Sequence, residues 1–220
     1  MWGPLLLLLG SATGLLRAPG RGVRGLALRA APVADLRREI AALLEPYGSP
    51  ALGVPADVAA AVDEKCRTLE ASAPPAPLDM LEGAWRVAYS TAPSPSNGAL
   101  GPFRGVGLQV VDVAGRAYVN ELALGPLTVR LRASFEPRSD SELRVAFESI
   151  EASLFGTTLV TTAFPPGVER TWLLTYTDAT TRVVRAGVDG GRSLAREAGL
   201  VSGGEAKDAY LFYLTRAPAS

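Results

Sequence analysis

From Gly83 onward the spacing of apolar residues changes from the helical period to the strand period, and this change constrains the fold more than any other feature. Apolar and polar residues then alternate, as in strands that have one face on a core and the other in water. The same-side sets are Trp85/Val87/Tyr89, Val129/Leu131/Phe135, Leu143/Val145/Phe147, Trp172/Leu174/Tyr176 and Tyr210/Phe212/Leu214.

Turn-forming residues separate about nine such strands, at the roughly 8–12-residue spacing that is typical of all-β folds. The predicted strands lie near 83–90, 105–113, 116–124, 128–135, 143–148, 157–164, 170–177, 181–186 and 209–216. No helical pattern interrupts them, and their one-sided alternation favours antiparallel pairing. The sequence therefore predicts an antiparallel barrel or sandwich.

Two short amphipathic helices are predicted before the strands. The first begins at Asp35, a suitable N-cap, and ends before Pro46. The second runs from about Pro55 to Ala71, and its apolar stripe includes Cys66, which we expect to be a small buried residue rather than a reactive thiol. We expect this pair to pack over one end of the barrel.

The first thirty residues have the character of a targeting leader. A run of leucines at 5–9 is too short to span a bilayer, and an Arg-rich, acid-free segment follows it. This order is typical of the bipartite leaders of secondary plastids, although a single mitochondrial or primary-plastid transit peptide also fits. We predict a removed leader at 1–30, a helix pair and Pro-rich spacer at 31–78, and a β domain at 79–220 with a flexible insertion at 187–208.

Composition excludes several classes of protein. The chain has no histidine and one cysteine, so it lacks Ser-His-Asp or Cys-His catalysis, His-ligated metals, Cys-based zinc sites and an internal disulfide. Without the four leader arginines it has 18 basic groups against 22 acidic ones, and this acidic balance argues against binding nucleic acid. We therefore predict no cofactor and no metal.

Several stretches resemble the plastid lipid-associated (fibrillin) family. LEGAWRVAYSTAP at 81–93 resembles its opening strand, L-x-G-x-W-x-L-x-Y-T/S-T/S, and GLQVVDVAGRAYVNELAL resembles its strand pair around Gln109, Asp112 and Asn120. TYTDATTRVVRAG resembles a later segment, with Asp178, Arg182 and Arg185 in matching places, and YLFYLTR its closing strand. The resemblance covers about 35–216 and departs from the family at the 187–208 insertion and at Ala186-Gly187, where the family has Arg-Gly.

The resemblance implies a lipocalin-like β-barrel of about eight to nine strands in a plastid protein. It also implies peripheral association with thylakoids or plastoglobules, and an apolar ligand such as a carotenoid, prenylquinone, tocopherol or galactolipid. Family members are thought to carry such molecules or to assist enzymes of prenylquinone synthesis.

The interior of a barrel of this size either holds one small ligand or is filled by its own side chains, and the sequence leaves both alternatives open. The candidate ligand-binding residues of the interior are Tyr89, Phe135, Phe147, Trp172, Tyr176 and Phe212. Gly83, Trp85 and Arg216 are expected to close the barrel, with the guanidinium over the indole. Asp178, Arg182 and Arg185 form either a polar mouth that contacts a headgroup or a solvated charge cluster.

Two other functions remain open. A protein-interaction module that assists a plastid enzyme or photosynthetic complex would suit the 187–208 insertion. An enzyme is disfavoured because the carboxylates at Asp112, Glu121 and Glu148 have no spacing that demands acid–base roles. We predict a non-enzymatic protein; Asp112 or Glu121 buried toward the interior would revive the enzyme.

Overall fold

The computed structural model describes residues 22–73, 76–187 and 209–218, with side chains from residue 33 onward. The predicted leader at 1–30 lies mostly outside the described residues, and so does the 187–208 insertion beyond its first residue.

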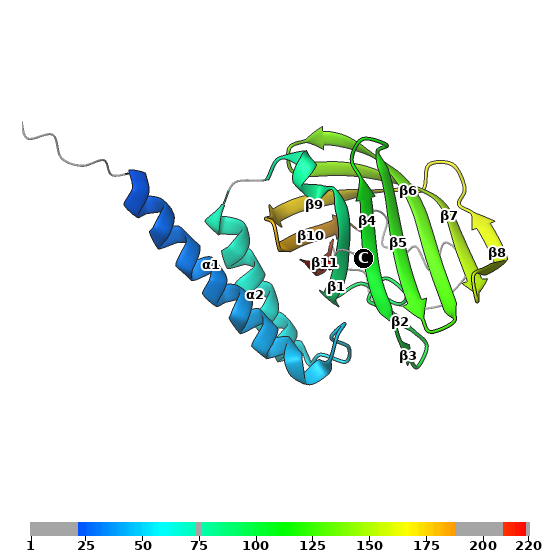
Figure 1. Cartoon of the computed structure of the whole chain (residues 1–220), viewed down its shortest axis with the longest axis horizontal. Helices are drawn as coiled ribbons and strands as arrows, with labels where there is room; N and C mark the ends of the chain where they lie inside the picture. Colours follow the sequence, from blue (N-terminus) through cyan, green and yellow to red (C-terminus); the bar gives the residue numbers. More distant parts are fainter. Residues whose placement is uncertain (1–21, 74–75, 188–208, 219–220) are drawn as a thin grey trace, which may run out of the picture.

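An antiparallel sheet closes on itself in a ring (Figure 1). Its order is β6-β5-β4-β1-β11-β10-β9-β7-β8, and β7 pairs again with β6, so β8 is attached to β7 outside the ring. The strands are β1 (Gly83–Ser90), β4 (Val106–Asp112), β5 (Ala117–Leu124), β6 (Leu127–Ser139), β7 (Glu142–Leu154), β8 (Thr157–Ala163), β9 (Glu169–Thr177), β10 (Thr181–Gly187) and β11 (Ala209–Arg216). The predicted mainly-β fold is confirmed. A small hairpin of β2 (Ala99–Leu100) and β3 (Phe103–Arg104) lies between β1 and β4.

β7 extends to Leu154, beyond its predicted end at 148. Its register against β6 shifts where Arg132 pairs with Ser149 and Ala133 with Phe147, which leaves Glu148 as an extra residue. A β-bulge of this kind reverses the alternation beyond it, so the period-two pattern stops there while the strand continues. The first half of β7 pairs with β9 and the second half with β8.

Two helices precede the ring: α1 (Gly22–Leu44) and α2 (Ala56–Ser72), with short 3-10 turns η1 (Glu45–Tyr47) and η2 (Leu78–Leu81) after them. α2 matches its prediction. Asp35 lies inside α1 and is not its N-cap, because the Ala-, Leu- and Arg-rich residues before it are strong helix formers that continue the helix upstream.

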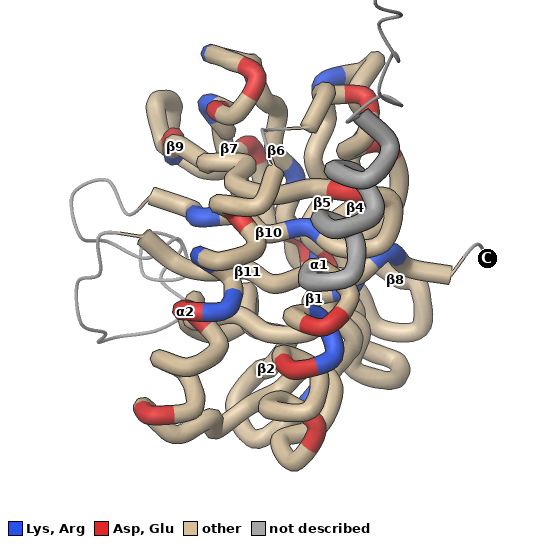
Figure 2. Tube along the Cα trace, turned by 90° about the vertical axis from the view of Figure 1, so that its left-hand side faces the viewer, with Lys and Arg blue, Asp and Glu red and all other residues tan. Residues whose placement is uncertain are grey.

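The helices cover one wall of the ring from outside, and the prediction that they pack over its end is wrong. Ile40, Val62, Cys66 and Leu69 form a core with outward-facing residues of β1, β9, β10 and β11. Figure 1 shows both helices beside these strands, and Figure 2, which looks onto this wall, shows acidic and basic residues interspersed along α2. Cys66 is fully buried there, as predicted.

Two β-bulges explain why the outer core holds residues predicted for the interior. In β1 the register shifts between Val87 and Tyr89, and in β9 it shifts between Leu174 and Tyr176. Each bulge adds one residue and so turns the following side chains to the opposite face. Tyr89 and Tyr176 therefore pack under the helices and not inside the ring.

Candidate functional site

One half of the ring interior is filled by aromatic side chains. Tyr118 meets Trp172 edge-on at 4.7 Å between centroids, and Trp172 stacks on Phe212 at 6.2 Å. Of the six residues predicted to line a ligand site, Phe135, Phe147, Trp172 and Phe212 belong to this interior core, and all are buried. These side chains mostly contact one another, so for this half the structure favours a filled core.

η2 and a pair of side chains lie at the filled end. Arg216 lies opposite Trp85 across β1 and β11, and its guanidinium carbon is 3.8 Å from the indole centroid. Arg216 also donates hydrogen bonds to the carbonyls of Met80 and Glu82. Gly83 has φ +96, and a Cβ there would lie 3.3 Å from Arg216 Nη1. Gly83, Trp85 and Arg216 thus lie together, and their role in closing the ring stays a prediction.

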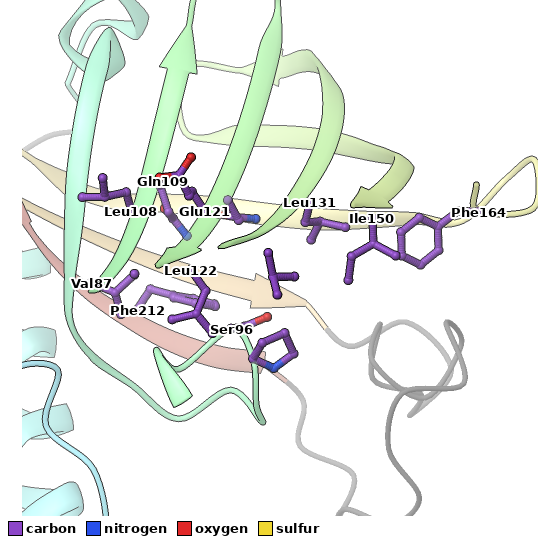
Figure 3. A pocket seen from close by; sticks show the side chains of 14 residues that line it. Val87, Ser96, Leu108, Gln109, Glu121, Leu122, Leu131, Ile150, Phe164 and Phe212 are labelled. Carbon is purple, nitrogen blue, oxygen red and sulfur yellow. The ribbon is translucent and has the colours of Figure 1, made fainter. Parts of the chain in front are cut away.

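The other half of the interior, the hollow half, is less completely filled. A pocket that opens to solvent, with a cavity volume of about 50 Å³, lies between β1, β4, β5, β6 and β7, and the segment after β1 borders it (Figure 3). Its lining is mostly apolar and consists of Val87, Pro95, Ser96, Gly107, Leu108, Gln109, Asn120, Glu121, Leu122, Val129, Leu131, Ile150, Phe164 and Phe212. Phe212 is the one predicted ligand-binding residue among them.

Gly107 helps to keep this half open. A Cβ built at Gly107 would contact Val87 at 3.4 Å, an ordinary van der Waals distance, so the backbone there tolerates a side chain. Sequence reasoning missed this residue. Its place at an inward position of β4, two residues before Gln109, was the available signal.

Two amides supply polar groups within the apolar lining. Gln109 and Asn120 face each other across β4 and β5, and Gln109 projects into the pocket in Figure 3. The Oδ1 atom of Asn120 is buried without a hydrogen-bond partner among the described residues. Such an atom is costly unless a further group satisfies it.

Behind Gln109 lies a buried cation. Tyr118 donates a hydrogen bond to Gln109 Oε1 at 2.5 Å and accepts one from Arg182 Nη2 at 2.5 Å. Arg182 is 0% exposed, and among the described residues its Nε and Nη1 have no hydrogen-bond partner. Its guanidinium lies 5.5 Å from the Tyr118 ring and 5.8 Å from the Trp85 ring. Burial raises the pKa of Tyr118, so this hydroxyl keeps its proton and remains a donor.

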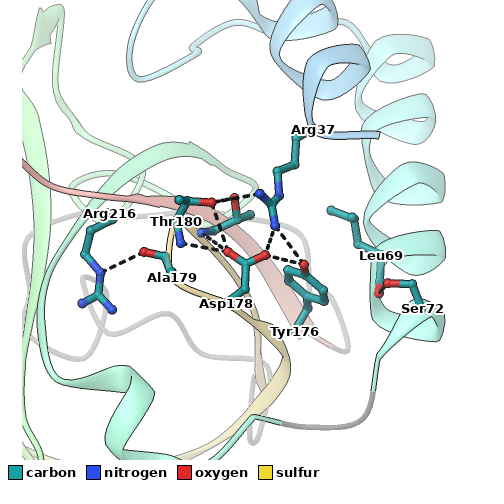
Figure 4. A network of polar contacts seen from close by, with 9 residues as sticks. Arg37, Leu69, Ser72, Tyr176, Asp178, Ala179, Thr180 and Arg216 are labelled. Carbon is teal, nitrogen blue, oxygen red and sulfur yellow. Dashed lines mark hydrogen bonds and ion pairs between the residues drawn. The ribbon is translucent and has the colours of Figure 1, made fainter. Parts of the chain in front are cut away.

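The predicted polar mouth does not exist, because its three residues lie in three places. Arg182 is inside the ring, whereas Arg185, three residues along β10, points outward to Glu70 and Asp63 of α2 at 2.8 Å each. Asp178 lies near the first helix, where it pairs with Arg37 and accepts from the backbone of Thr180 (Figure 4). An odd spacing within one strand places two side chains on opposite faces, so the sequence itself argued against grouping Arg182 with Arg185.

The carboxylates considered for catalysis do not form an interior acid–base pair. Asp112 is exposed and accepts a hydrogen bond from Gly115 N, and Glu148 is also exposed. Glu121 borders the pocket but is bonded to Arg130 at 2.7 Å. Across 33–73, 76–187 and 209–218 no three His, Cys, Asp or Glu side chains are placed to hold a metal.

No helix in the described ranges combines the length and apolar character needed to cross a bilayer. A search of curated proteins gives no significant match to the chain. A model of the PAP_fibrillin family matches residues 47–190, well over half of the 220-residue chain and including most of the ring. The protein therefore belongs to the PAP_fibrillin family of plastid lipid-associated proteins.

Proposed function

We propose that the protein holds one apolar lipid in the hollow half of its ring, at the surface of thylakoids or plastoglobules. The family is in general a non-catalytic, lipid-associated one. The observation that carries the proposal is the mostly apolar lining of the pocket, which contains a few polar groups, since a concave site of this character is the usual form of a small-molecule site. The family resemblance suggests a ligand of the carotenoid, prenylquinone, tocopherol or galactolipid classes.

The second half of the proposal, contact with a lipid surface, rests on the β7–β8 hairpin. Residues 152–168 contain no charged residue, and every residue of β8 is exposed. Phe155, at the hairpin tip, is 82% exposed, and Leu159 in β8 is 62% exposed. Phe164 of the same segment lines the pocket, so the uncharged surface continues to the site of the ligand. An apolar surface of this kind marks a contact with a membrane or a partner.

The conformation of Phe155 supports a role for its side chain. Its φ is +48, a region that is uncommon for an aromatic residue and is occupied more readily by glycine or asparagine. A strained, exposed aromatic residue at a hairpin tip is consistent with selection for surface contact. Phe155→Asn is therefore a well-matched variant, because it relaxes the backbone while it removes the ring.

A second candidate function is a protein-interaction module that assists a plastid enzyme or photosynthetic complex. The outer edge of β8 favours it, since one side of β8 pairs with β7 and the other pairs with no described strand. An unpaired edge accepts a strand from a partner. Import through the leader at 1–30 is part of the proposal in either case.

The test is native purification of residues 31–220 from a host that makes carotenoids and quinones, followed by organic extraction and mass spectrometry. We expect a stoichiometric apolar lipid in the wild type and in Gly107→Ala, and its loss in Gly107→Leu, whose side chain enters the pocket. A stably folded wild-type protein without lipid would contradict the proposal and favour the interaction module.

The surface contact is tested separately by flotation with galactolipid vesicles. We expect the wild type to float and Phe155→Asn to remain largely in the soluble fraction. Deletion of 35–72 gives the opposite control, because flotation lost with the helices would place the membrane contact on them instead.

A further inference from the structure

The hydrogen-bonded chain from Arg182 through Tyr118 to Gln109 ends at the pocket and carries a positive charge toward it. The guanidinium of Arg182 brings a positive charge into the fully buried interior. Among the described residues no carboxylate forms an ion pair with it. A buried charge without a counter-ion is strongly unfavourable.

The surroundings of Arg182 reduce this cost only in part. Two aromatic faces lie at 5.5 and 5.8 Å, and one of its three nitrogens has the Tyr118 hydroxyl as acceptor. The positive potential in this region also affects Arg216, whose pKa is lowered by burial first and then by the charge of Arg182. The interior around Arg182 thus carries a net positive charge, and no carboxylate among the described residues compensates it.

Gln109 links the buried Arg182 and Tyr118 to the pocket. Its Oε1 accepts from Tyr118, which leaves its amide N–H groups to donate toward a ligand. The nearby Asn120 side chain lines the same pocket, but its unpaired buried atom is the acceptor Oδ1, which needs a donor and not an anion. Among the described residues of the lining, Glu121 is the one that carries a carboxylate. Arg130 forms an ion pair with Glu121 and lies 3.8 Å from Glu151.

We propose that this subsite selects an amphiphile whose polar end is a carboxylate, such as a long-chain fatty acid, with its chain along the apolar lining and its headgroup at the Gln109 amide. The inference rests on the proposed lipid site and replaces the uncharged ligand classes suggested by the family resemblance with a carboxylate lipid. In this arrangement the carboxylate accepts from the N–H groups of Gln109 and compensates the charge of Arg182 through Tyr118. The buried anion and the buried cation then stabilise each other.

The first test compares a long-chain fatty acid with its methyl ester of the same chain length, by displacement of a fluorescent lipid from the wild-type protein at pH 8. We expect the acid to bind at least tenfold more tightly than the ester. Equal affinities overturn the inference and leave the lipid pocket standing, whereas no binding of either compound overturns both proposals.

The second test uses Gln109→Glu, which preserves the size of the side chain and its acceptor for Tyr118. Its carboxylate supplies the missing counter-charge, so we expect thermal stability equal to or above that of the wild type. The acid should lose at least tenfold in affinity while the ester keeps its own. A stable Gln109→Glu protein that still prefers the acid contradicts the inference.

Two further variants separate the subsite from charge in general. Tyr118→Phe removes the hydroxyl that links Arg182 to Gln109, and we expect the preference for the acid to fall. Arg185→Lys, on the outer face of the same strand, should leave the preference unchanged; a loss there would show that the selectivity comes from the outer surface and would overturn the proposed subsite.

Discussion

The two halves of the ring interior are built from the same strands and differ in the size of their inward residues. β1 places Trp85 in the filled half and Val87 beside the pocket, and β5 places Tyr118 in the filled half and Leu122 beside the pocket. On β4 the inward residue beside the pocket is Gly107, which has no side chain. A ring of this size can therefore be filled in one half and contain a pocket in the other. The volumes of the inward side chains along each strand decide where the packed core ends.

The strongest test of this comparison is truncation of a large residue in each half. Trp85→Ala should lower the free energy of unfolding by about 3–5 kcal/mol, because it leaves a cavity and removes the surface on which Arg216 packs. Val87→Ala, next to an existing hollow, should cost only about 1–2 kcal/mol. Urea unfolding monitored by circular dichroism measures both, and equal losses would contradict the division into two halves.

The dependence of stability on alkaline pH tests whether water is excluded from the core between the helices and the ring. Burial raises the pKa of Cys66 from 9.0 to about 12 and that of Tyr213 from 10.0 to about 12. The folded protein therefore holds these protons where the unfolded chain releases them, so stability that is complete below pH 9 is lost as pH rises toward 12.

The expected loss is about 1.4 kcal/mol per pH unit for each group within its window. Unfolding free energies at pH 8 and pH 10.5 measure it, and Cys66→Ala should remove the part that begins near pH 9. A wild-type stability that is flat over this range would show that water reaches these residues.

The outer wall provides a smaller test. Arg185→Ala leaves Glu70 of α2 without its cation and Asp63 with Arg67 alone, and we expect a loss of about 1–3 kcal/mol. Amide hydrogen exchange should show the loss of protection mainly in α2 and β10. A uniform loss of protection over the whole ring would mean that the helices and the ring unfold as one unit. The stability of the outer wall could then not be measured apart from that of the ring interior.

The smallest expected effect on stability is in the hollow half. Gly107→Ala should change the free energy of unfolding by less than about 1 kcal/mol, since its Cβ meets Val87 at 3.4 Å and the substitution restricts the unfolded chain. Thermal unfolding measures this shift. A large loss would indicate that the backbone at Gly107 is more crowded than the pocket suggests.

The strands and the second helix could be predicted from the sequence because alternation and helical period are local signals. The faces of Tyr89 and Tyr176 could not, since one extra residue in each of β1 and β9 reverses the alternation and only pairing with a neighbouring strand reveals it. Of the site, Phe212 was predicted, and Gln109 and Asn120 were noticed only as parts of a motif. The contact between Arg182 and Tyr118 joins residues far apart in sequence, so no local pattern indicates it.

Photo-crosslinking can locate a lipid bound inside the hollow half of the ring. A long-chain lipid that carries a diazirine near the end of its chain is bound to the full ring, irradiated, and mapped by peptide mass spectrometry. We expect crosslinks to β5, β6 or β7 at residues such as Leu122, Leu131 and Ile150, and their loss in Gly107→Leu. Crosslinks confined to the helices or to the exposed face of β8 would contradict lipid binding inside the hollow half.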